Sequence, residues 1–206
     1  MSIAKRCFDL FWSATGIVLL SPLFGLIALA IRLDDKGPAL FRQERVGYRG
    51  KPFRMLKFRT MIVDAERMGK QLTVGRDPRI TRVGYWLRKT KLDELPQLIN
   101  VIRGEMSLVG PRPEVPRYVA AYDAEQRKVL DLRPGITDPA SITYYDESDL
   151  LAGAPDPEMM YLAEVMPEKI RINLEYARRA NTLSDLGIIL KTIFRMVNRR
   201  AVPNRG

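Results

Sequence analysis

The sequence predicts an α+β, predominantly helical fold for a monotopic membrane protein, held in the bilayer by one re-entrant N-terminal helix. Three observations predict it: an uncharged run at residues 10–31, apolar residues at helical spacing in several later stretches, and only short segments with an extended pattern. We expect a re-entrant, proline-broken membrane helix at residues 1–35. A cytoplasmic domain with amphipathic interfacial helices is expected at residues 36–206.

The apolar run is long enough to span a bilayer, because about 22 helical residues reach about 33 Å. Pro22 lies in its middle and removes an N–H whose partner would be the carbonyl of Val18. We therefore expect the helix to kink or break at Ser21-Pro22. The Ser21 hydroxyl can bond back to a freed carbonyl one turn earlier, which makes a bend within the membrane tolerable.

Basic residues flank both ends of this run. Lys5 and Arg6 precede it, and nine Lys or Arg residues between Arg32 and Arg59 follow it. Since basic residues favour the cytoplasmic side, both ends are expected there, and a re-entrant hairpin satisfies this. A proline-kinked single span is the alternative. A cleaved signal peptide is a third reading, favoured by the spacing of the small residues Ala28 and Ala30 but opposed by the length of the run and the basic stretch behind it.

Charge and composition limit the ligands and catalytic groups that this chain can use. The net charge is +10, and residues 1–60 carry 11 basic and 4 acidic side chains, which suits anionic phospholipid or phosphorylated substrates. The chain has no histidine and one cysteine, Cys7. This excludes Ser-His and Cys-His nucleophile pairs, histidine-ligated zinc and an internal disulfide. Catalysis must therefore rest on carboxylates, Lys, Arg, Tyr or Ser.

The first half of the domain is expected to contain a hairpin and short helices. The predicted elements are extended segments at 39–41 and 51–61 around a turn at 47–50, a polar helix at 62–71, a turn at 77–78 and a helix at 80–89. A further helix begins near Pro96 and carries Leu98 and Ile102 at helical spacing. Gly104 is placed to cap its C-terminal end.

The second half is predicted from turn signals and one amphipathic pattern. A helix is expected at 118–130, a turn at 133–135 and a long acidic loop at 138–157. Apolar and basic residues alternate at helical spacing over 184–202. That helix either lies on a membrane surface or packs on the domain core, and the pattern fits both.

Asp93 and Glu94 are the main candidates for chemistry. Adjacent side chains diverge on a helix, which argues against a shared-proton pair and favours two separate roles. A purely structural role is the alternative, because acidic residues are favoured at helix starts. Arg112 and Arg133 have neighbouring prolines, which hold a guanidinium ready for a phosphate. Carboxylates near basic groups are what metal-assisted phosphoryl transfer needs.

Seven short motifs follow one another along the chain from Lys5 to about Ile193. They are Lys5-Arg6-x-x-Asp9, Ser21-Pro22, Lys57-Phe58-Arg59-Thr60-Met61, Leu92-Asp93-Glu94-Leu95-Pro96-Gln97, Gly104-Glu105-Met106-Ser107, Val109-Gly110-Pro111-Arg112-Pro113 and Arg133-Pro134-Gly135-Ile136-Thr137. In this ordered combination the chain resembles the bacterial sugar transferase family, specifically its small monotopic phosphoglycosyl transferases. These start lipid-linked glycan assembly.

The resemblance implies transfer of a sugar 1-phosphate from a UDP-sugar to polyprenyl (undecaprenyl) phosphate, with release of UMP. Asp93 would be the nucleophile that forms a covalent phosphosugar intermediate and would also hold Mg²⁺, with Glu94 as a base or positioning group. The implied phosphate-binding residues are Lys57, Arg59, Arg88, Arg112 and Arg133. The implied site lies at the cytoplasmic face of the bacterial inner membrane, in exopolysaccharide or lipopolysaccharide assembly.

The sequence departs from the family pattern after Thr137, where Asp138-Pro139-Ala140-Ser141 and the acidic loop replace the usual continuation, so sugar specificity does not transfer. The sequence leaves the donor, the carrier length, the glycan pathway and the choice between monomer and homodimer open. A membrane-surface adaptor without catalysis is the other reading of the basic face and apolar segments. A nucleic-acid binder is disfavoured, because no complete recognition motif accompanies the interleaved aromatic and basic residues.

Overall fold

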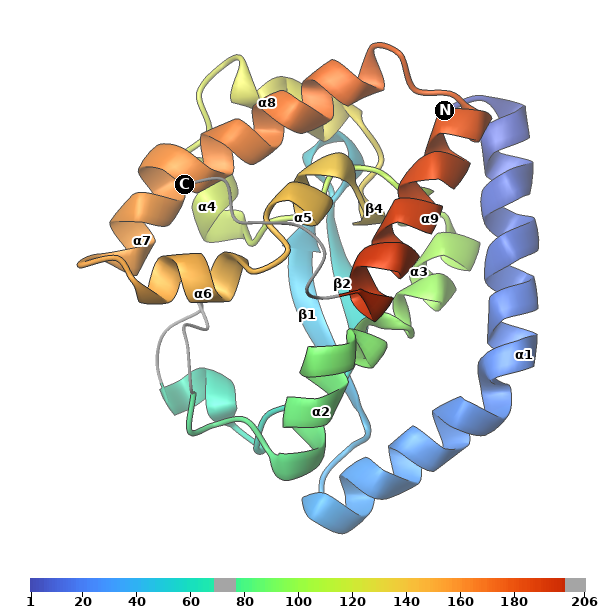
Figure 1. Cartoon of the computed structure of the whole chain (residues 1–206), viewed down its shortest axis with the longest axis vertical. Helices are drawn as coiled ribbons and strands as arrows, with labels where there is room; N and C mark the ends of the chain where they lie inside the picture. Colours follow the sequence, from blue (N-terminus) through green and yellow to red (C-terminus); the bar gives the residue numbers. More distant parts are fainter. Residues whose placement is uncertain (69–76, 199–206) are drawn as a thin grey trace.

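A computed structural model of the chain describes residues 1–68 and 77–198. Its helices are α1 (Ile3–Asp34), α2 (Arg82–Thr90), α3 (Gln97–Arg103), α4 (Pro116–Ala120), α5 (Pro139–Thr143), α6 (Glu147–Ala152), α7 (Pro157–Met160), α8 (Met166–Ala177) and α9 (Thr182–Val197). The strands are β1 (Leu40–Val46), β2 (Pro52–Phe58), β3 (Ser107–Val109) and β4 (Gly135–Thr137). The predominantly helical α+β prediction is confirmed (Figure 1).

The apolar run forms α1, one continuous helix of 32 residues that is capped by Ser2. Pro22 lies inside this helix without ending it, and the helix bends part-way along (Figure 1). The Ser21 hydroxyl donates to the Val18 carbonyl over 2.8 Å, and this carbonyl is the one that Pro22 deprives of an amide partner. Of the two predicted outcomes, a kink or a break, the break was wrong, because α1 is a continuous, bent helix (Figure 1).

The N-terminal half of α1 is held by polar contacts with α3 and β3. Asp9 is fully buried and accepts hydrogen bonds from Ser107 Oγ over 2.7 Å and from the Leu108 amide over 3.2 Å. Arg6 donates to two carbonyls in the last turn of α3, at 2.7 and 2.9 Å. Lys5 forms an ion pair with Asp185 of α9. The Lys-Arg-x-x-Asp motif therefore docks α1 onto the domain.

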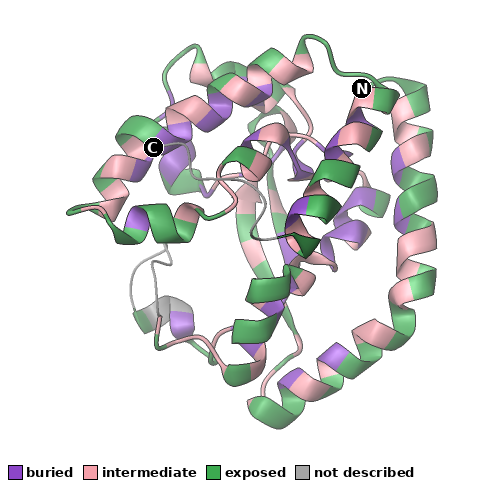
Figure 2. Ribbon diagram, in the orientation of Figure 1, coloured by how far each residue is buried: buried purple, intermediate pink, exposed green. Residues whose placement is uncertain are grey.

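The C-terminal half of α1 packs through apolar side chains. Phe24 meets the ring of Phe58 edge-on at a centroid distance of 5.5 Å, and Ile27 and Ile31 are buried in the same cluster with Leu87 of α2. The outer face of α1 remains largely exposed (Figure 2). Within residues 1–68 and 77–198, α1 is the helix long and apolar enough to cross a membrane.

Two small sheets organise the domain. β1 and β2 pair antiparallel around the predicted turn, with Leu40 opposite Phe58. β3 and β4 pair in parallel, with Val109 opposite Thr137. The prediction of a simple turn at 133–135 missed this second pair, which joins two of the sequence motifs. Gly135 permits it, because a Cβ there would lie 2.1 Å from the Gly110 amide nitrogen.

Two predictions for the second half were wrong. The helix expected at 118–130 is split into α4 and a 3-10 turn at Gln126–Asp131, because the Asp123 carboxylate accepts a hydrogen bond from the Gln126 amide over 2.8 Å and starts a new turn. The loop expected at 138–157 contains α5 and α6. Asp138 caps α5 by accepting from the Ser141 amide over 2.9 Å, with Pro139 in the first turn.

Other predicted elements differ in length or type. The expected polar helix at 62–71 is a 3-10 turn at Ala65–Met68, and residues 69–71 lie outside the described residues. α8, which contributes to the core under α4, was not predicted. α9 packs on the core through Ile188, while Leu183, Leu190 and Phe194 are exposed on its other side. Residues 199–202 of the predicted C-terminal helix lie outside the described residues.

Candidate active site

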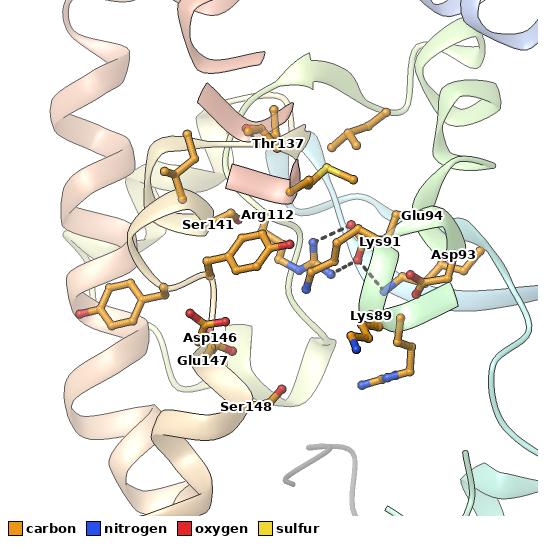
Figure 3. A pocket seen from close by; sticks show the side chains of 18 of the residues that line it. Lys89, Lys91, Asp93, Glu94, Arg112, Thr137, Ser141, Asp146, Glu147 and Ser148 are labelled. Carbon is orange, nitrogen blue, oxygen red and sulfur yellow. Dashed lines mark hydrogen bonds and ion pairs between the residues drawn. The ribbon is translucent and has the colours of Figure 1, made fainter. Parts of the chain in front are cut away.

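A cavity of about 590 Å³ lies where α2, α5, α6 and α9 meet around the Asp93-Glu94 turn (Figure 3). Its lining includes five of the seven predicted catalytic and substrate-binding residues: Lys57, Arg88, Asp93, Glu94 and Arg112. These residues come from β2, α2, the turn before α3 and the segment after β3. Residues that are far apart in the sequence therefore converge on one site.

Asp93 lies in a 3-10 turn at Leu92–Glu94, which separates α2 from α3. Asp93 is only 6% exposed, and none of the described residues forms a hydrogen bond with its Oδ1 atom. Burial raises the pKa of Asp93 above its ordinary value, and the negative charge of Glu94 adds to this effect. A buried carboxylate oxygen without a partner is costly, which makes Asp93 a candidate for binding or chemistry.

Glu94 has the opposite environment. Both terminal nitrogens of the Arg112 guanidinium donate to Glu94, Nη2 to Oε1 over 2.5 Å and Nη1 to Oε2 over 3.2 Å. Lys57 Nζ lies 3.5 Å from Glu94 Oε1. Burial acts to raise the pKa of Glu94, but the charges of Arg112 and Lys57 outweigh it and hold that pKa well below its usual range. Burial lowers the pKa of Lys57 to about 8, although Glu94 opposes the shift.

Asn100 of α3 fixes the position of the turn that carries both acids. This fully buried side chain accepts a hydrogen bond from the Leu56 amide over 2.9 Å and donates to the Arg54 carbonyl over 2.9 Å. Asn100 thus satisfies the free edge of β2 and locks α3 against the strand that carries Lys57. The relative position of Lys57 and Glu94 follows from this contact.

Arg112 is placed by the parallel β3–β4 pair and by a second buried network. The Arg45 guanidinium donates to the Pro113 carbonyl over 3.1 Å and lies 3.6 Å from the Glu114 carboxylate, which also accepts a hydrogen bond from Tyr161. The Glu114 carbonyl accepts from the Val46 amide of β1 over 2.9 Å. The backbone on the C-terminal side of Arg112 is therefore anchored to β1.

The opposite wall of the cavity is the segment predicted as a loop. Glu147 of α6 pairs with Lys169 of α8 over 2.6 Å, and Asp146 lies 3.3 Å from Arg195 of α9. Tyr145 lies between cations: Lys91 Nζ is 5.4 Å and Arg195 Cζ 5.3 Å from its ring centroid. This wall thus joins α5, α6, α8 and α9 across the cavity from Asp93.

Arg59 and Arg133 do not line this cavity. Arg59 is 6% exposed and binds the Asp35 carbonyl over 2.6 Å just beyond α1, so it anchors the end of that helix. Arg133 donates to the Gly104 carbonyl at the end of α3 and lies over the Tyr48 ring, with 5.8 Å between Cζ and the centroid. Both arginines thus contact backbone carbonyls away from the cavity.

Lys91 and Tyr145 are among the cavity residues that the sequence did not single out as site residues. Lys91 precedes the acidic pair and has a left-handed backbone, with φ of 58°, between α2 and the 3-10 turn. Such a conformation in a non-glycine residue often marks a functional site. Tyr145 lay within the predicted loop, where the Asp138-Pro139 helix-start signal could have indicated ordered structure.

Asp93 is the residue that fits a bound Mg²⁺. In the described part of the chain, no three acidic, histidine or cysteine side chains gather into a protein-only metal site. Mg²⁺ usually takes one or two carboxylates and completes its shell with water and substrate phosphate. Asp93, which lines a cavity with several cations for phosphate and whose Oδ1 has no partner among the described residues, suits that arrangement.

The family model for bacterial sugar transferases matches residues 1–199. The chain belongs to the bacterial sugar transferase family. Among its relatives is the "UDP-glucose:undecaprenyl-phosphate glucose-1-phosphate transferase" of Escherichia coli K12, 37% identical over 97% of this chain and 41% of the relative. A Caulobacter vibrioides protein of the same name is 38% identical over 94% of this chain and 69% of the relative.

A third member of the family has a different sugar in its name. The "UDP-N-acetylgalactosamine-undecaprenyl-phosphate N-acetylgalactosaminephosphotransferase" of Aeromonas hydrophila is 37% identical over 92% of this chain and 42% of its own length. This chain therefore spans less than half the length of the Escherichia coli and Aeromonas relatives. Their names differ in the sugar, so family membership leaves the donor undecided.

Proposed function

We propose that this protein transfers a sugar 1-phosphate from a UDP-sugar to polyprenyl phosphate, giving a polyprenyl-diphospho-sugar and UMP. The observation that carries the proposal is Asp93, a buried carboxylate with an unpartnered oxygen, in a cavity lined by Lys57 and Arg112. A carboxylate nucleophile beside fixed cations is suited to phosphoryl transfer. The names of the relatives supply the substrate class.

Asp93 acts first as the nucleophile in the proposed reaction. One of its carboxylate oxygens attacks the sugar-side phosphorus, the bond from that phosphorus to the bridging oxygen breaks, and UMP leaves with the bonding electrons. An oxygen of polyprenyl phosphate then attacks the same phosphorus, which breaks its bond to Asp93 and restores the carboxylate. The raised pKa of Asp93 reflects a weakly solvated, more basic carboxylate, which is a better nucleophile once ionised.

Glu94 is a positioning group rather than a base in this scheme. Arg112 and Lys57 contact both of its oxygens, and its lowered pKa keeps it ionised. It therefore aligns two cations toward the phosphate oxygens. Arg88 and Lys91 complete the basic side of the cavity. Asp93 would hold a bound Mg²⁺, which would further neutralise phosphate charge.

Release of UMP by the purified full chain tests this proposal. With Mg²⁺, polyprenyl phosphate and a panel of UDP-sugars, we expect release with at least one donor and loss of release in Asp93→Asn. The same reaction quenched before acceptor addition should contain protein carrying a phosphosugar. If folded protein in lipid releases no UMP from any donor, the membrane-surface adaptor is favoured, which the exposed apolar faces of α1 and α9 also suit.

We also propose that α1 enters the bilayer and returns, with the domain on the cytoplasmic face of the inner membrane. Support comes from the packing, because Arg6 and Asp9 dock one half of α1 and Phe24 and Ile31 dock the other half onto the same domain. A helix that crossed the membrane straight would carry its two ends to opposite sides.

The single cysteine offers a direct test of this topology. Cys7 is exposed near the start of α1. In spheroplasts, a membrane-impermeant maleimide should label neither Cys7 nor a Lys36→Cys variant in a Cys7→Ser background, and both should react after permeabilisation. Labelling of either position in intact spheroplasts would replace the hairpin with a single span.

A further inference from the structure

The cavity has two walls of opposite character (Figure 3). On the side of Asp93, the lining carries cations from β2, α2 and the segment after β3: Lys57, Arg88, Lys89, Lys91 and Arg112. Across from them, the lining from α5 to α6 carries carboxylates and hydroxyl groups: Ser141, Tyr144, Tyr145, Asp146, Glu147, Ser148 and Asp149. A ligand with both phosphate and neutral polar groups therefore has one preferred orientation in this cavity.

Two of the three carboxylates of the second wall are held by cations outside the first wall, and one of these cations, Lys169, itself lines the cavity. Lys169 of α8 is 8% exposed and binds Glu147 Oε2 over 2.6 Å. Arg195 of α9 is 7% exposed and lies 3.3 Å from Asp146 Oδ2. A carboxylate has about four acceptor sites, so these contacts leave it able to accept further hydrogen bonds. Each partner comes from a core helix, which fixes the acid before any ligand arrives.

An independent observation indicates that the cavity holds a ligand. Asp93 lines the same cavity and is only 6% exposed. Its Oδ1 atom has no partner among the described residues. Proteins seldom leave a buried carboxylate oxygen unpaired without a function for it. Asp146 and Glu147, whose side chains are 43% and 26% exposed, thus line the same cavity as this unpaired carboxylate.

We propose that Asp146 and Glu147 form a subsite that recognises a pair of sugar hydroxyls on the donor. This inference rests on the proposed function, which supplies a ligand with a diphosphate between two sugar rings. The diphosphate is attracted to Arg112 and Lys91, whereas Glu147 and Asp146 are already paired with Lys169 and Arg195, so a neutral ring faces α6. Its hydroxyls then donate charge-assisted hydrogen bonds to the carboxylates. The ring is either the transferred sugar or the ribose of uridine.

The Asp146→Asn/Glu147→Gln double variant tests the subsite, because both amides keep the shape and can still contact Arg195 and Lys169. Binding is measured by calorimetry on the full chain in nanodiscs, with UDP-glucose, UDP-glucuronic acid and UMP as probes. We expect the Kd for UDP-glucose to rise about tenfold, since each charged acceptor becomes a neutral one. Glu125→Gln is the matched control, because that exposed acid pairs with Lys128 away from the cavity.

The probes separate the two sources of hydroxyls. If the transferred sugar faces the acids, the protein binds UDP-glucuronic acid at least about tenfold more weakly than UDP-glucose, the double variant removes this difference, and binding of UMP is unchanged. If ribose faces them, the Kd values for UMP and UDP-glucose rise by the same factor. The subsite is ruled out if the double variant binds all three probes within twofold of the unmodified protein.

Turnover distinguishes this proposal from the transferase activity itself. UMP release with unchanged binding in the double variant overturns the subsite and leaves the proposed function standing. Altered binding without UMP release from any donor supports the subsite and overturns the transfer reaction. If the unmodified protein neither binds UDP-glucose or UMP nor releases UMP, both proposals fail.

Discussion

Two buried aspartates in this protein have opposite surroundings. Asp9 of α1 is fully buried, and each of its oxygens accepts a hydrogen bond from β3. Asp93 is almost as buried, yet its Oδ1 has no described partner and its carboxylate lines a cavity. The comparison teaches that burial alone does not identify a catalytic acid. A fully satisfied acid joins elements together, whereas an unsatisfied one beside a cavity is available to a ligand.

The largest effect is expected when Asp93 is neutralised. Asp93→Asn should lower UMP release at least about a thousandfold, because an amide cannot form the aspartyl intermediate. The melting temperature should stay the same or rise, since the variant removes a poorly compensated buried charge. Thermal unfolding and UMP release on the same sample measure both. A large drop in melting temperature would make Asp93 a structural acid like Asp9.

The reverse experiment removes Asp9. Asp9→Ala leaves the Ser107 hydroxyl and the Leu108 amide buried without partners and frees the N-terminal half of α1. We expect a loss of about 2–4 kcal/mol in the free energy of unfolding, measured by denaturant titration in mixed micelles. The exposed Asp131→Ala serves as control and should change it by less than about 0.5 kcal/mol. An equally small effect at Asp9 would refute the docking role.

The geometry of the Arg112–Glu94 ion pair beside Asp93 can be tested separately from its charge. Arg112→Lys keeps the charge but loses the two-pronged contact with Glu94, so we expect kcat/KM to fall about 10–100-fold. Arg133→Lys is the matched control, since that arginine lies outside the cavity and binds the Gly104 carbonyl. Its kcat/KM should change less than threefold. Equal losses in the two variants would mean that Arg112 acts through the fold.

The pH dependence of substrate binding follows from Lys57. Because burial lowers its pKa to about 8, Lys57 is charged below that pH and loses its proton above it. We expect the Kd for a UDP-sugar to rise by up to about tenfold per unit above pH 8, while phosphate stays fully ionised. Calorimetric titration between pH 7 and 10 measures this. In Lys57→Arg the rise should disappear, and its persistence would assign the titration to another group.

The smallest expected effect concerns the bend in α1. Ser21→Ala removes the hydrogen bond to the Val18 carbonyl and should cost about 1 kcal/mol in the free energy of unfolding. In a Pro22→Ala background the backbone amide returns, so the same substitution should cost almost nothing. A double-mutant cycle in mixed micelles measures the difference. Equal costs in both backgrounds would show that Ser21 does not replace the bond that Pro22 removes.

Local patterns in the sequence predicted much of this protein. The apolar run forms α1, and the hydrogen bond from the Ser21 hydroxyl to a carbonyl one turn earlier was predicted from the proline alone. The helix that begins near Pro96 ends at Gly104 in the left-handed conformation, as its spacing and cap indicated. These features depend on residues within a turn or two of one another, so short-range sterics and hydrogen bonding decide them. The ordered motifs also sufficed to predict the family.

Only the tertiary structure decided which predicted residues meet. Arg112 and Arg133 both have a neighbouring proline, yet one binds Glu94 in the cavity and the other binds backbone at Gly104. The choice depends on the parallel pairing of β3 with β4, which local spacing does not reveal. The acidic segment likewise became a cavity wall because Lys169 and Arg195 hold it. Such contacts join distant parts of the chain, and only packing selects among the alternatives.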